Sequence, residues 1–395
     1  MTNHRIAVTG IGIISAIGKG INECWNSILN YRSGIGKMKY LPSIHTNIPV
    51  AEVDFSDQDL RNLLNICKSE PINRTALLGI VAAKEAINMA KLDTLPPLTA
   101  FINGTTVGGM EKTEQFYPDF KNNEDYIALH DCGGTTDCMA NRCGNFAFTS
   151  TISTACSSAA NAILFGYNML QTNKIDCVIV GGSECLTKFH FNGFHALQIL
   201  SDKPCRPFDA NRSGLTLGEG AAFLVLEREC DAKQRKANIL CYLSGWGNAC
   251  DAYHYTTTSP QGHGAYLSMQ SALQSAGLKS TDIDYINAHG TGTLNNDETE
   301  GRAMQNLFGN NIPPFSSTKA YTGHTTSASG AIEAVFSILA LCHNIIPANL
   351  NFETSMPELN ICPQQQNDST KSIQHVLCNS FGFGGNDTTL IFSKI

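Results

Sequence analysis

A cysteine lies at the junction between a predicted strand and a predicted helix. The stretch from Phe148 to Thr154 is rich in β-branched residues, and the stretch from Ser157 to Leu170 contains helix formers without proline. Cys156 therefore precedes the first turn of a helix, where free backbone amides and the helix dipole favour a thiolate. Because the thiolate is the nucleophilic form, Cys156 is a candidate nucleophile. Cysteines are also often buried for packing alone, so other residues must support this interpretation.

Four further features could complete a reactive site. His289 lies in Asn-Ala-His-Gly-Thr-Gly-Thr (287–293) at the end of a predicted strand, where a side chain can face a pocket. Lys319 precedes His324, which begins an apolar helix, and residues 381–385 form the glycine-dense loop Phe-Gly-Phe-Gly-Gly. Each feature alone is more often structural. Together they supply a nucleophile, two imidazoles, a cation and a source of backbone amides.

The composition excludes several classes of function. The net charge is −7, and 42% of the residues are apolar against 15% charged, which is typical of a compact globular protein without a basic field for nucleic acid. No uninterrupted apolar run reaches membrane-spanning length, and no convincing signal peptide precedes Ile6. Fifteen scattered cysteines are an odd number and indicate reduced thiols. We therefore expect a soluble cytoplasmic protein with no nucleic-acid or membrane partner.

Two weaker motifs are interpreted as structural. Cys132, Cys138 and Cys143 lie near His130, but only the last two cysteines have a zinc-like spacing and no second pair completes a site, so no metal is expected. The glycines in residues 10–15 follow a strand in the manner of a dinucleotide-binding loop, yet a serine stands in place of the third glycine. A tight strand-to-helix turn is favoured there.

The order of predicted elements indicates an α/β protein with two similar halves. Residues 284–290 resemble residues 99–104, and the apolar helix after His324 matches the helix after Cys156. Residues 1–240 would form the half with the cysteine, and residues 241–395 the half with both histidines. Two buried helices, each preceded by a reactive side chain, would bring Cys156 and His324 to a shared centre. Residues 33–73 are expected to be an irregular surface segment, and residues 111–137 a polar insertion.

These motifs resemble those of the β-ketoacyl-acyl-carrier-protein synthases, the condensing enzymes of fatty-acid and polyketide synthesis. The resemblance covers the whole chain in order. It includes Ala-Val-Thr-Gly-Ile-Gly (7–12), Thr-Ala-Cys-Ser-Ser (154–158), Arg-Pro-Phe-Asp (206–209), Gly-Glu-Gly (218–220), Asp-Ala-Tyr-His (251–254), Asn-Ala-His-Gly-Thr-Gly-Thr (287–293), Lys-Ala-Tyr-Thr-Gly-His (319–324) with Glu333, and Asn-Ser-Phe-Gly-Phe-Gly-Gly (379–385). The Cys-His-His set resembles the elongating branch, not the Cys-His-Asn initiating enzymes or the thiolases with a second C-terminal cysteine.

The resemblance implies a thiolase fold, with duplicated α/β halves in a five-layered α-β-α-β-α arrangement and a homodimer. It implies a decarboxylative Claisen condensation in which an acyl chain held on Cys156 reacts with malonyl-acyl carrier protein to give a 3-oxoacyl chain. The partner is acyl carrier protein, which brings acyl and malonyl thioesters on its own phosphopantetheine arm. No other cofactor and no metal are implied.

The resemblance also implies a role for each site residue. The backbone amides of Cys156 and Phe383 would hold the oxyanion, and the Phe383 side chain would gate the acyl cavity. Neutral His289 and His324 would donate hydrogen bonds to the enolate. The remaining implied roles are the orientation of His324 by Lys319, the pairing of Lys319 with Glu333, the binding of pantetheine by Thr291 and Thr293, and the lining of the acyl pocket by Val107 and Phe194.

Several alternatives remain open at this stage. The chain could be the chain-length-determining partner subunit of a heterodimeric ketosynthase, although such subunits typically lack the nucleophilic cysteine. A CoA-dependent acyltransferase or thiolase is disfavoured by the missing second cysteine. The polar stretch 125–137 departs from the apolar acyl-pocket segment of the family, so a specialised aryl-polyene or polyketide substrate is possible. Lys68, Arg74 and Lys203 are weak candidates for a carrier-protein surface.

Overall fold

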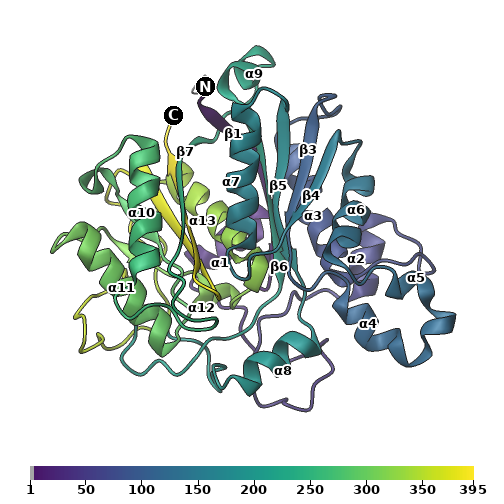
Figure 1. Cartoon of the computed structure of the whole chain (residues 1–395), viewed down its shortest axis with the longest axis horizontal. Coiled ribbons are helices and arrows are strands. Elements are labelled where there is room, and N and C mark those ends of the chain that lie inside the picture. Colours follow the sequence, from purple (N-terminus) through teal and green to yellow (C-terminus); the bar gives the residue numbers. More distant parts are fainter. Residues whose placement is uncertain (1–3) are drawn as a thin grey trace.

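The computed structural model describes residues 4–395 as an α/β protein built in five layers (Figure 1). Helices α7 (Ser158–Gln171) and α13 (Ser329–His343) form the central layer and contact strands of both halves of the sheet. Helix α3 (Arg74–Met89) covers the outer face of one half. Helix α10 (His263–Ala276), with α11 (Leu294–Phe308) packed beside it, covers the other. The predicted thiolase fold is confirmed.

The strands form one mixed sheet whose two halves meet between β1 and β7. In order across the sheet they are β4 (Phe148–Ile152), β3 (Thr99–Gly104), β5 (Cys177–Glu184), β6 (Gly220–Arg228), β1 (Ile6–Ser15), β7 (Cys241–Cys250), β11 (Asn386–Ser393), β10 (His375–Gly382), β8 (Tyr285–Asn287) and β9 (Phe315–Ser316), and β2 (Gly18–Lys19) pairs with β1. Strands β1 and β7 pair only from Ile6 to Val8. The proposed division between residues 240 and 241 falls directly before β7.

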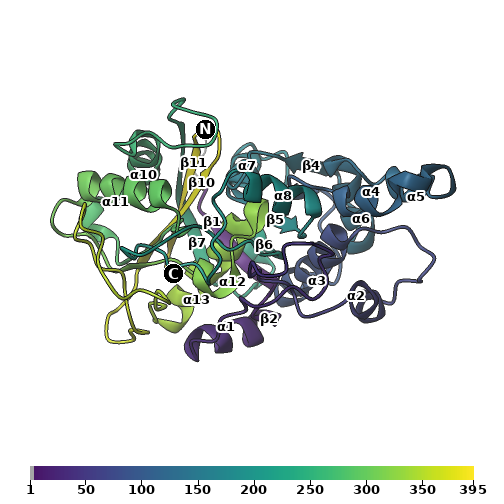
Figure 2. The same cartoon turned by 90° about the horizontal axis from the view of Figure 1, so that it is seen from below.

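The remaining helices lie at the edges and ends of these layers (Figure 2). They are α1 (Ile21–Leu29), α2 (Asp57–Leu64), α4 (Met110–Phe116), η1 (Tyr117–Asn122), α5 (Glu124–Ile127), α6 (Cys132–Cys143), α8 (Lys188–Ala196), α9 (Glu229–Gln234), η2 (Ser280–Asp282), α12 (Lys319–Thr322) and η3 (Thr326–Ala328). Helix α8 lies below the sheet and the central helices in the view of Figure 1.

Helix α13 is buried because it is apolar on nearly every face. All of its residues from Ser329 to Leu341 are buried. Within residues 4–395, the stretch Thr326–His343 has the length and hydropathy of a membrane span, but 89% of it lies inside the protein. A helix that is hydrophobic all round fits the centre of a large fold, so this stretch is a core helix.

Two local predictions are wrong. Residues 10–15 do not turn into a helix, because β1 continues to Ser15 and its glycines pack against α3. A Cβ on Gly10 would collide with the carbonyl oxygen of Ala86, so the glycines allow close strand–helix contact. The segment 33–73 is also not irregular throughout. It contains α2, which is started by a capping box between Ser56 and Asp59.

Candidate active site

Cys156 lies in a strained turn between β4 and α7. Ala155 has a φ of 51°, a left-handed conformation that is unusual for a residue with a Cβ. The Ser157 hydroxyl donates to the carbonyl oxygen of Thr154 at 2.8 Å, and Cys156 is 5% exposed. Helix α7 begins at Ser158. Cys156 therefore lies before a helix N-terminus, as predicted.

The thiol of Cys156 is not held as a resting thiolate. Burial raises its pKa to about 11, against the opposing effects of the Phe383 backbone amide and the Lys319 charge. The expected stabilisation by the helix N-terminus is therefore outweighed by desolvation. The sulfur has to lose its proton as it attacks. The effect of the Phe383 amide on this pKa places the glycine loop beside the sulfur.

Lys319 contacts His289 and Glu333. Its Nζ lies 3.2 Å from Nδ1 of His289, donates to the His289 carbonyl oxygen at 2.5 Å and forms an ion pair with Glu333. Lys319 is 1% exposed, so this pairing compensates a buried charge. The predicted pairing with Glu333 is confirmed. The expectation that Lys319 orients His324 is wrong, because its ammonium contacts the other imidazole.

His324 is oriented by a serine. Its Nδ1 lies 2.9 Å from Oγ of Ser329, and its ring is edge-on to the ring of His289 with centroids 5.3 Å apart. Burial, followed by the Lys319 charge, lowers the pKa of both imidazoles well below the usual value of 6.5. Both histidines are therefore neutral at pH 7, as the sequence resemblance implied.

The contacts at Nδ1 define which nitrogen carries the proton in His289. An ammonium group has three donors and no acceptor, so Nδ1 of His289 must accept from Lys319 and Nε2 must carry the hydrogen. The Ser329 hydroxyl can donate to Nδ1 of His324 and so leave Nε2–H of that ring free in the same way. Both rings line one cavity with Cys156. Two neutral N–H donors can therefore face a substrate held there.

The glycine loop closes one side of this cavity. The ring of Phe383 stacks on the ring of Phe194 from α8, with centroids 5.8 Å apart and planes 17° apart. Asn386, directly after the loop, accepts hydrogen bonds from Ser157 at 2.9 Å and from Asn161 at 2.7 Å. These contacts fasten the end of the loop to the nucleophile turn.

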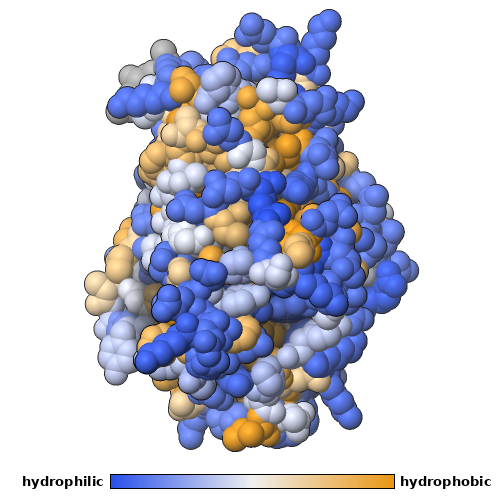
Figure 3. All heavy atoms as spheres, turned by 90° about the vertical axis from the view of Figure 1, so that its right-hand side faces the viewer, coloured by the Kyte–Doolittle hydropathy of each residue, from blue (hydrophilic) through white to orange (hydrophobic). Residues whose placement is uncertain are grey.

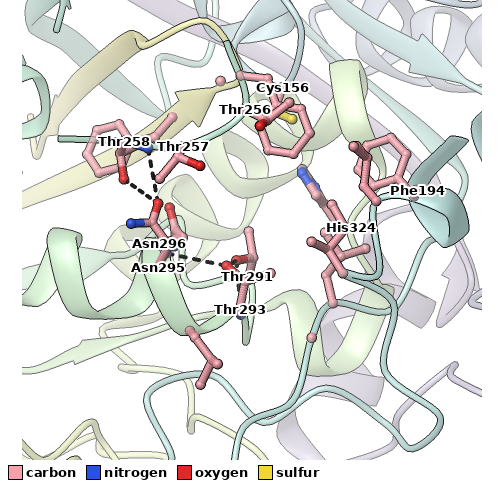
Figure 4. Close-up of a pocket in the computed structure, with 18 of the residues that line it drawn as sticks. Cys156, Phe194, Thr256, Thr257, Thr258, Thr291, Thr293, Asn295, Asn296 and His324 are labelled. Atoms are coloured by element: carbon pink, nitrogen blue, oxygen red, sulfur yellow. Dashed lines mark hydrogen bonds between the residues drawn. The ribbon is translucent and has the colours of Figure 1, made fainter. Parts of the chain in front are cut away.

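The cavity has a volume of about 320 Å³ and a hydroxyl-rich wall opposite the aromatic rings. Figure 4 shows Phe194 and His324 on one side of the cavity and Thr257, Thr258, Asn295 and Asn296 on the other, with Thr291 and Thr293 below. Thr291 and Thr293 hydrogen-bond to each other at 2.9 Å. Seven predicted site residues line this cavity: Cys156, Phe194, His289, Thr291, Thr293, His324 and Phe383. Lys319 and Glu333 do not line it, but Lys319 contacts His289 and Glu333 pairs with Lys319. Val107 is buried in the core and does not line the cavity.

Sequence reasoning missed part of this wall. Asn295 accepts hydrogen bonds from the backbone and the hydroxyl of Thr258, which joins α11 to the 256–258 loop. Asn296 and Thr257 also line the cavity. The run of three threonines beside the Asp-Ala-Tyr-His motif was the available signal. Ser329 carried no comparable signal, since serine is common within small-residue helices.

One of the predicted surface cations is internal. Arg74 is buried, with Nη2 2.6 Å from Glu219 and Nη1 2.9 Å from Asp57, so it is not a surface residue for a partner. Lys68 and Lys203 are exposed. Among residues 4–395, no cluster of three or more histidine, cysteine or acidic side chains could hold a metal ion.

The five-layered fold and a buried cysteine facing two neutral imidazoles define a thiolase-like enzyme of the condensing class. Models of the beta-ketoacyl synthase N-terminal and C-terminal domains match residues 3–232 and 240–353. The chain therefore belongs to the beta-ketoacyl synthase family. The predicted family and enzyme class, an acyltransferase, are confirmed.

Similar proteins cover the full length of the chain. The 3-oxoacyl-(acyl-carrier-protein) synthase 2 of Staphylococcus aureus (strain COL) is 32% identical, with 99% of each chain covered. The solved ishigamide ketosynthase/chain length factor matches at a TM-score of 0.91 and 27% identity, with both chains fully covered. A type II ketosynthase solved with its acyl-carrier protein matches at 0.89 and 26% identity, with 99% of this chain and 100% of that chain covered.

Proposed function

We propose that this protein is an elongating 3-oxoacyl-acyl-carrier-protein synthase that holds its acyl chain on Cys156. The observation that carries the proposal is the shared cavity of Cys156, His289 and His324, in which Nδ1 of each imidazole has a hydrogen-bond partner and Nε2 has none among residues 4–395. The partner-subunit alternative is disfavoured because this chain has a complete nucleophile and both proton donors. The related synthase of S. aureus carries the same activity in its name.

The first half-reaction transfers the acyl group to Cys156. The sulfur attacks the thioester carbonyl of an acyl carrier protein, and the pantetheine thiol leaves with the proton that the cysteine loses. The backbone amides of Cys156 and Phe383 hold the oxyanion of this step. Amides that are already positioned cost no reorganisation during the reaction, which is why a fixed turn and loop suit this role.

The second half-reaction forms the new carbon–carbon bond. Malonyl carrier protein loses carbon dioxide, and the thioester oxygen gains the negative charge of an enolate. The Nε2–H groups of His289 and His324 donate to this oxygen, where donors aimed at developing charge are most effective. The enolate carbon attacks the acyl carbonyl on Cys156, and the sulfur leaves as the thiolate.

The hydroxyl-rich wall is the site of the pantetheine arm. Pantetheine carries amide and hydroxyl groups, which match the side chains of Thr291, Thr293 and the 256–258 loop. The acyl carrier protein is the partner that supplies the arm, so the enzyme needs no bound cofactor of its own. Lys68 and Lys203 are exposed cations that could meet an acidic carrier protein.

A homodimer is proposed through the free edge of β4. This strand is at the end of the sheet, so one of its sides is unpaired. Figure 3 shows the side of the molecule to which α4, α5 and α6 belong, where apolar patches interrupt the hydrophilic surface. Tyr117 and Phe120 of η1, which lies between α4 and α5, and Phe148 of β4 are exposed large apolar residues. A cytoplasmic location is also proposed, as expected from the composition of the sequence.

A specialised polyene or polyketide substrate is a second candidate. Its support is the polar character of residues 125–137, where His130 Nδ1 lies 2.8 Å from Oγ1 of Thr113 and Asp131 caps α6. One of the solved relatives is described as the ketosynthase of a type II PKS bound to a hexaketide. Mass spectrometry of malonyl-dependent products across acyl carrier proteins of different chain length and unsaturation tests both candidates. The absence of any product extended by two carbons would overturn the condensing function.

A further inference from the structure

Asp387 is a buried carboxyl group directly after the glycine loop. It is 1% exposed, and neither of its side-chain oxygens has a hydrogen-bond partner among residues 4–395. An unpaired carboxylate is costly in such a place. The charged groups that act on it are the carboxyl groups of Asp251 and Glu300, so no cation compensates it. Cys250, His254 and His263, which are titratable groups on the adjoining chain segment 250–263, are exposed.

Asp251 and Asp387 approach each other across a glycine. A Cβ on Gly264 of α10 would collide with Oδ2 of Asp387 and lie 2.9 Å from Cβ of Asp251. The backbone N–H of Asp251 donates to the carbonyl oxygen of Gly385 at 3.1 Å, and a Cβ on Gly385 would collide with Oδ1 of Asp251. The carboxyl pair is thus packed against the end of the glycine loop.

The loop itself can hinge at this point. Gly384 and Gly385 have φ values of 83° and 77°, in the region that favours glycine. A Cβ on Gly384 would meet no atom within 4 Å, so this part of the loop has free space beside it. The backbone N–H of Gly384 donates to the carbonyl oxygen of Tyr255 at 2.9 Å, which ties the loop to the 251–259 segment. A change in the ionisation of Asp387 or Asp251 can therefore move Phe383, because the glycine loop and the 251–259 segment are joined by hydrogen bonds.

We propose that Asp387 and Asp251 are positioning residues for the glycine loop: a proton held on Asp387 keeps Phe383 beside Cys156, and loss of that proton releases the loop. The inference rests on the proposed function, because it assigns the loop to the acyl-transfer site. In the released state water can reach the Asp387 carboxylate, and its repulsion with Asp251 is reduced. Loop opening is then coupled to ionisation of a group that contacts no substrate.

The sign of the pH effect follows from linkage. Burial, followed by the charge of Asp251, raises the pKa of Asp387 in the closed loop to about 8. A released, solvated aspartate ionises near its ordinary pKa of about 4. Between these values the closed state binds one proton that the open state does not. The equilibrium constant for loop closure therefore falls by up to about tenfold per pH unit as the pH rises from about 4 to about 8.

Hydrogen exchange of the free enzyme tests this proposal without substrate. Protection factors of the amides from Phe383 to Asn386, corrected for the intrinsic pH dependence of exchange, are measured from pH 5 to pH 8. In the wild type they are expected to fall steadily with pH. In Asp387→Asn, which keeps the shape but cannot ionise, they are expected to stay constant. Asp93→Asn, at an exposed site, serves as the matched control and should follow the wild type.

Two outcomes would overturn the inference. One is a wild-type protection factor that does not fall with pH, a result that decides the question even if Asp387→Asn does not fold. The other is the same pH profile in the wild type and in Asp387→Asn. Neither outcome touches the proposed function, which is tested separately by condensation products.

Discussion

The Nζ of Lys319 lies 3.2 Å from Nδ1 of His289, and this contact fixes the proton of that imidazole on Nε2. A buried ammonium held by Glu333 thus presents a neutral histidine to the cavity in its donor form. The same ammonium also lowers the pKa of Cys156, although burial has the larger and opposite effect. Lys319 therefore acts on residues of both half-reactions, although it does not itself line the cavity.

Removal of the Lys319 contact should impair decarboxylation. Lys319→Met combined with Glu333→Gln avoids an uncompensated buried carboxylate. Without the donor at Nδ1, His289 can adopt the other tautomer, and we expect carbon dioxide release from malonyl carrier protein to fall by about 10²–10³-fold. The matched control is Glu333→Gln alone, which keeps Lys319 beside His289. An equal loss in both variants would contradict this role.

Ser329 should matter for His324, and its neighbour Ser327 should not. Ser329→Ala removes the hydrogen bond at Nδ1 of His324, a loss of about 1–2 kcal/mol that corresponds to a 5–30-fold slower decarboxylation. Ser327 is equally buried, but its hydroxyl has no partner among the described residues. Ser327→Ala is therefore expected to retain near wild-type rates. Similar losses in both variants would point to packing in place of hydrogen bonding.

The pH profile of decarboxylation should lack a limb at the ordinary histidine pKa. Burial and Lys319 lower the pKa of both imidazoles well below 6.5, so the neutral donors persist as pH falls through that value. We expect a constant rate from pH 8 to below pH 6 and a decline only at more acidic pH. The measurement is carbon dioxide release at saturating malonyl carrier protein. A half-maximal rate near pH 6.5 would contradict neutral histidines held by burial.

Thr257 should contribute to binding of the pantetheine arm. It lines the cavity, and no protein group within residues 4–395 hydrogen-bonds its hydroxyl. Thr257→Val should raise the KM for carrier-protein substrates several-fold, with kcat and the melting temperature unchanged. Thr293→Val serves as a contrast, because Thr293 also caps α11 and its loss should lower stability by about 1 kcal/mol. An unchanged KM in Thr257→Val would show that Thr257 does not bind the pantetheine arm.

Much of the site could be predicted from the sequence. Cys156, His289 and His324 follow strands or precede helices, and those positions place side chains at the centre of a duplicated α/β fold. The imidazole that Lys319 contacts could not be predicted in this way. His324 was expected, whereas the ammonium group of Lys319, in α12, contacts His289.

Other errors also arose from packing that a single sequence does not encode. The glycines of β1 were interpreted as a turn because turns and close strand–helix contacts use the same residue. Arg74 was taken for a surface cation, since its acidic partner Glu219 lies far along the chain. The ionisation of Cys156 depends on how deeply the folded protein buries it, and a helix N-terminus alone did not predict that.

Intact-mass analysis of the acylated enzyme is the most direct test of the central claim. The wild type is incubated with acyl carrier protein thioesters, and the adduct is localised by peptide mapping. The expected result is one acyl group on Cys156, absent in Cys156→Ala and present in Cys230→Ala, which removes an exposed cysteine. No adduct with any acyl chain, or an adduct that persists in Cys156→Ala, would contradict Cys156 as the acyl-holding nucleophile.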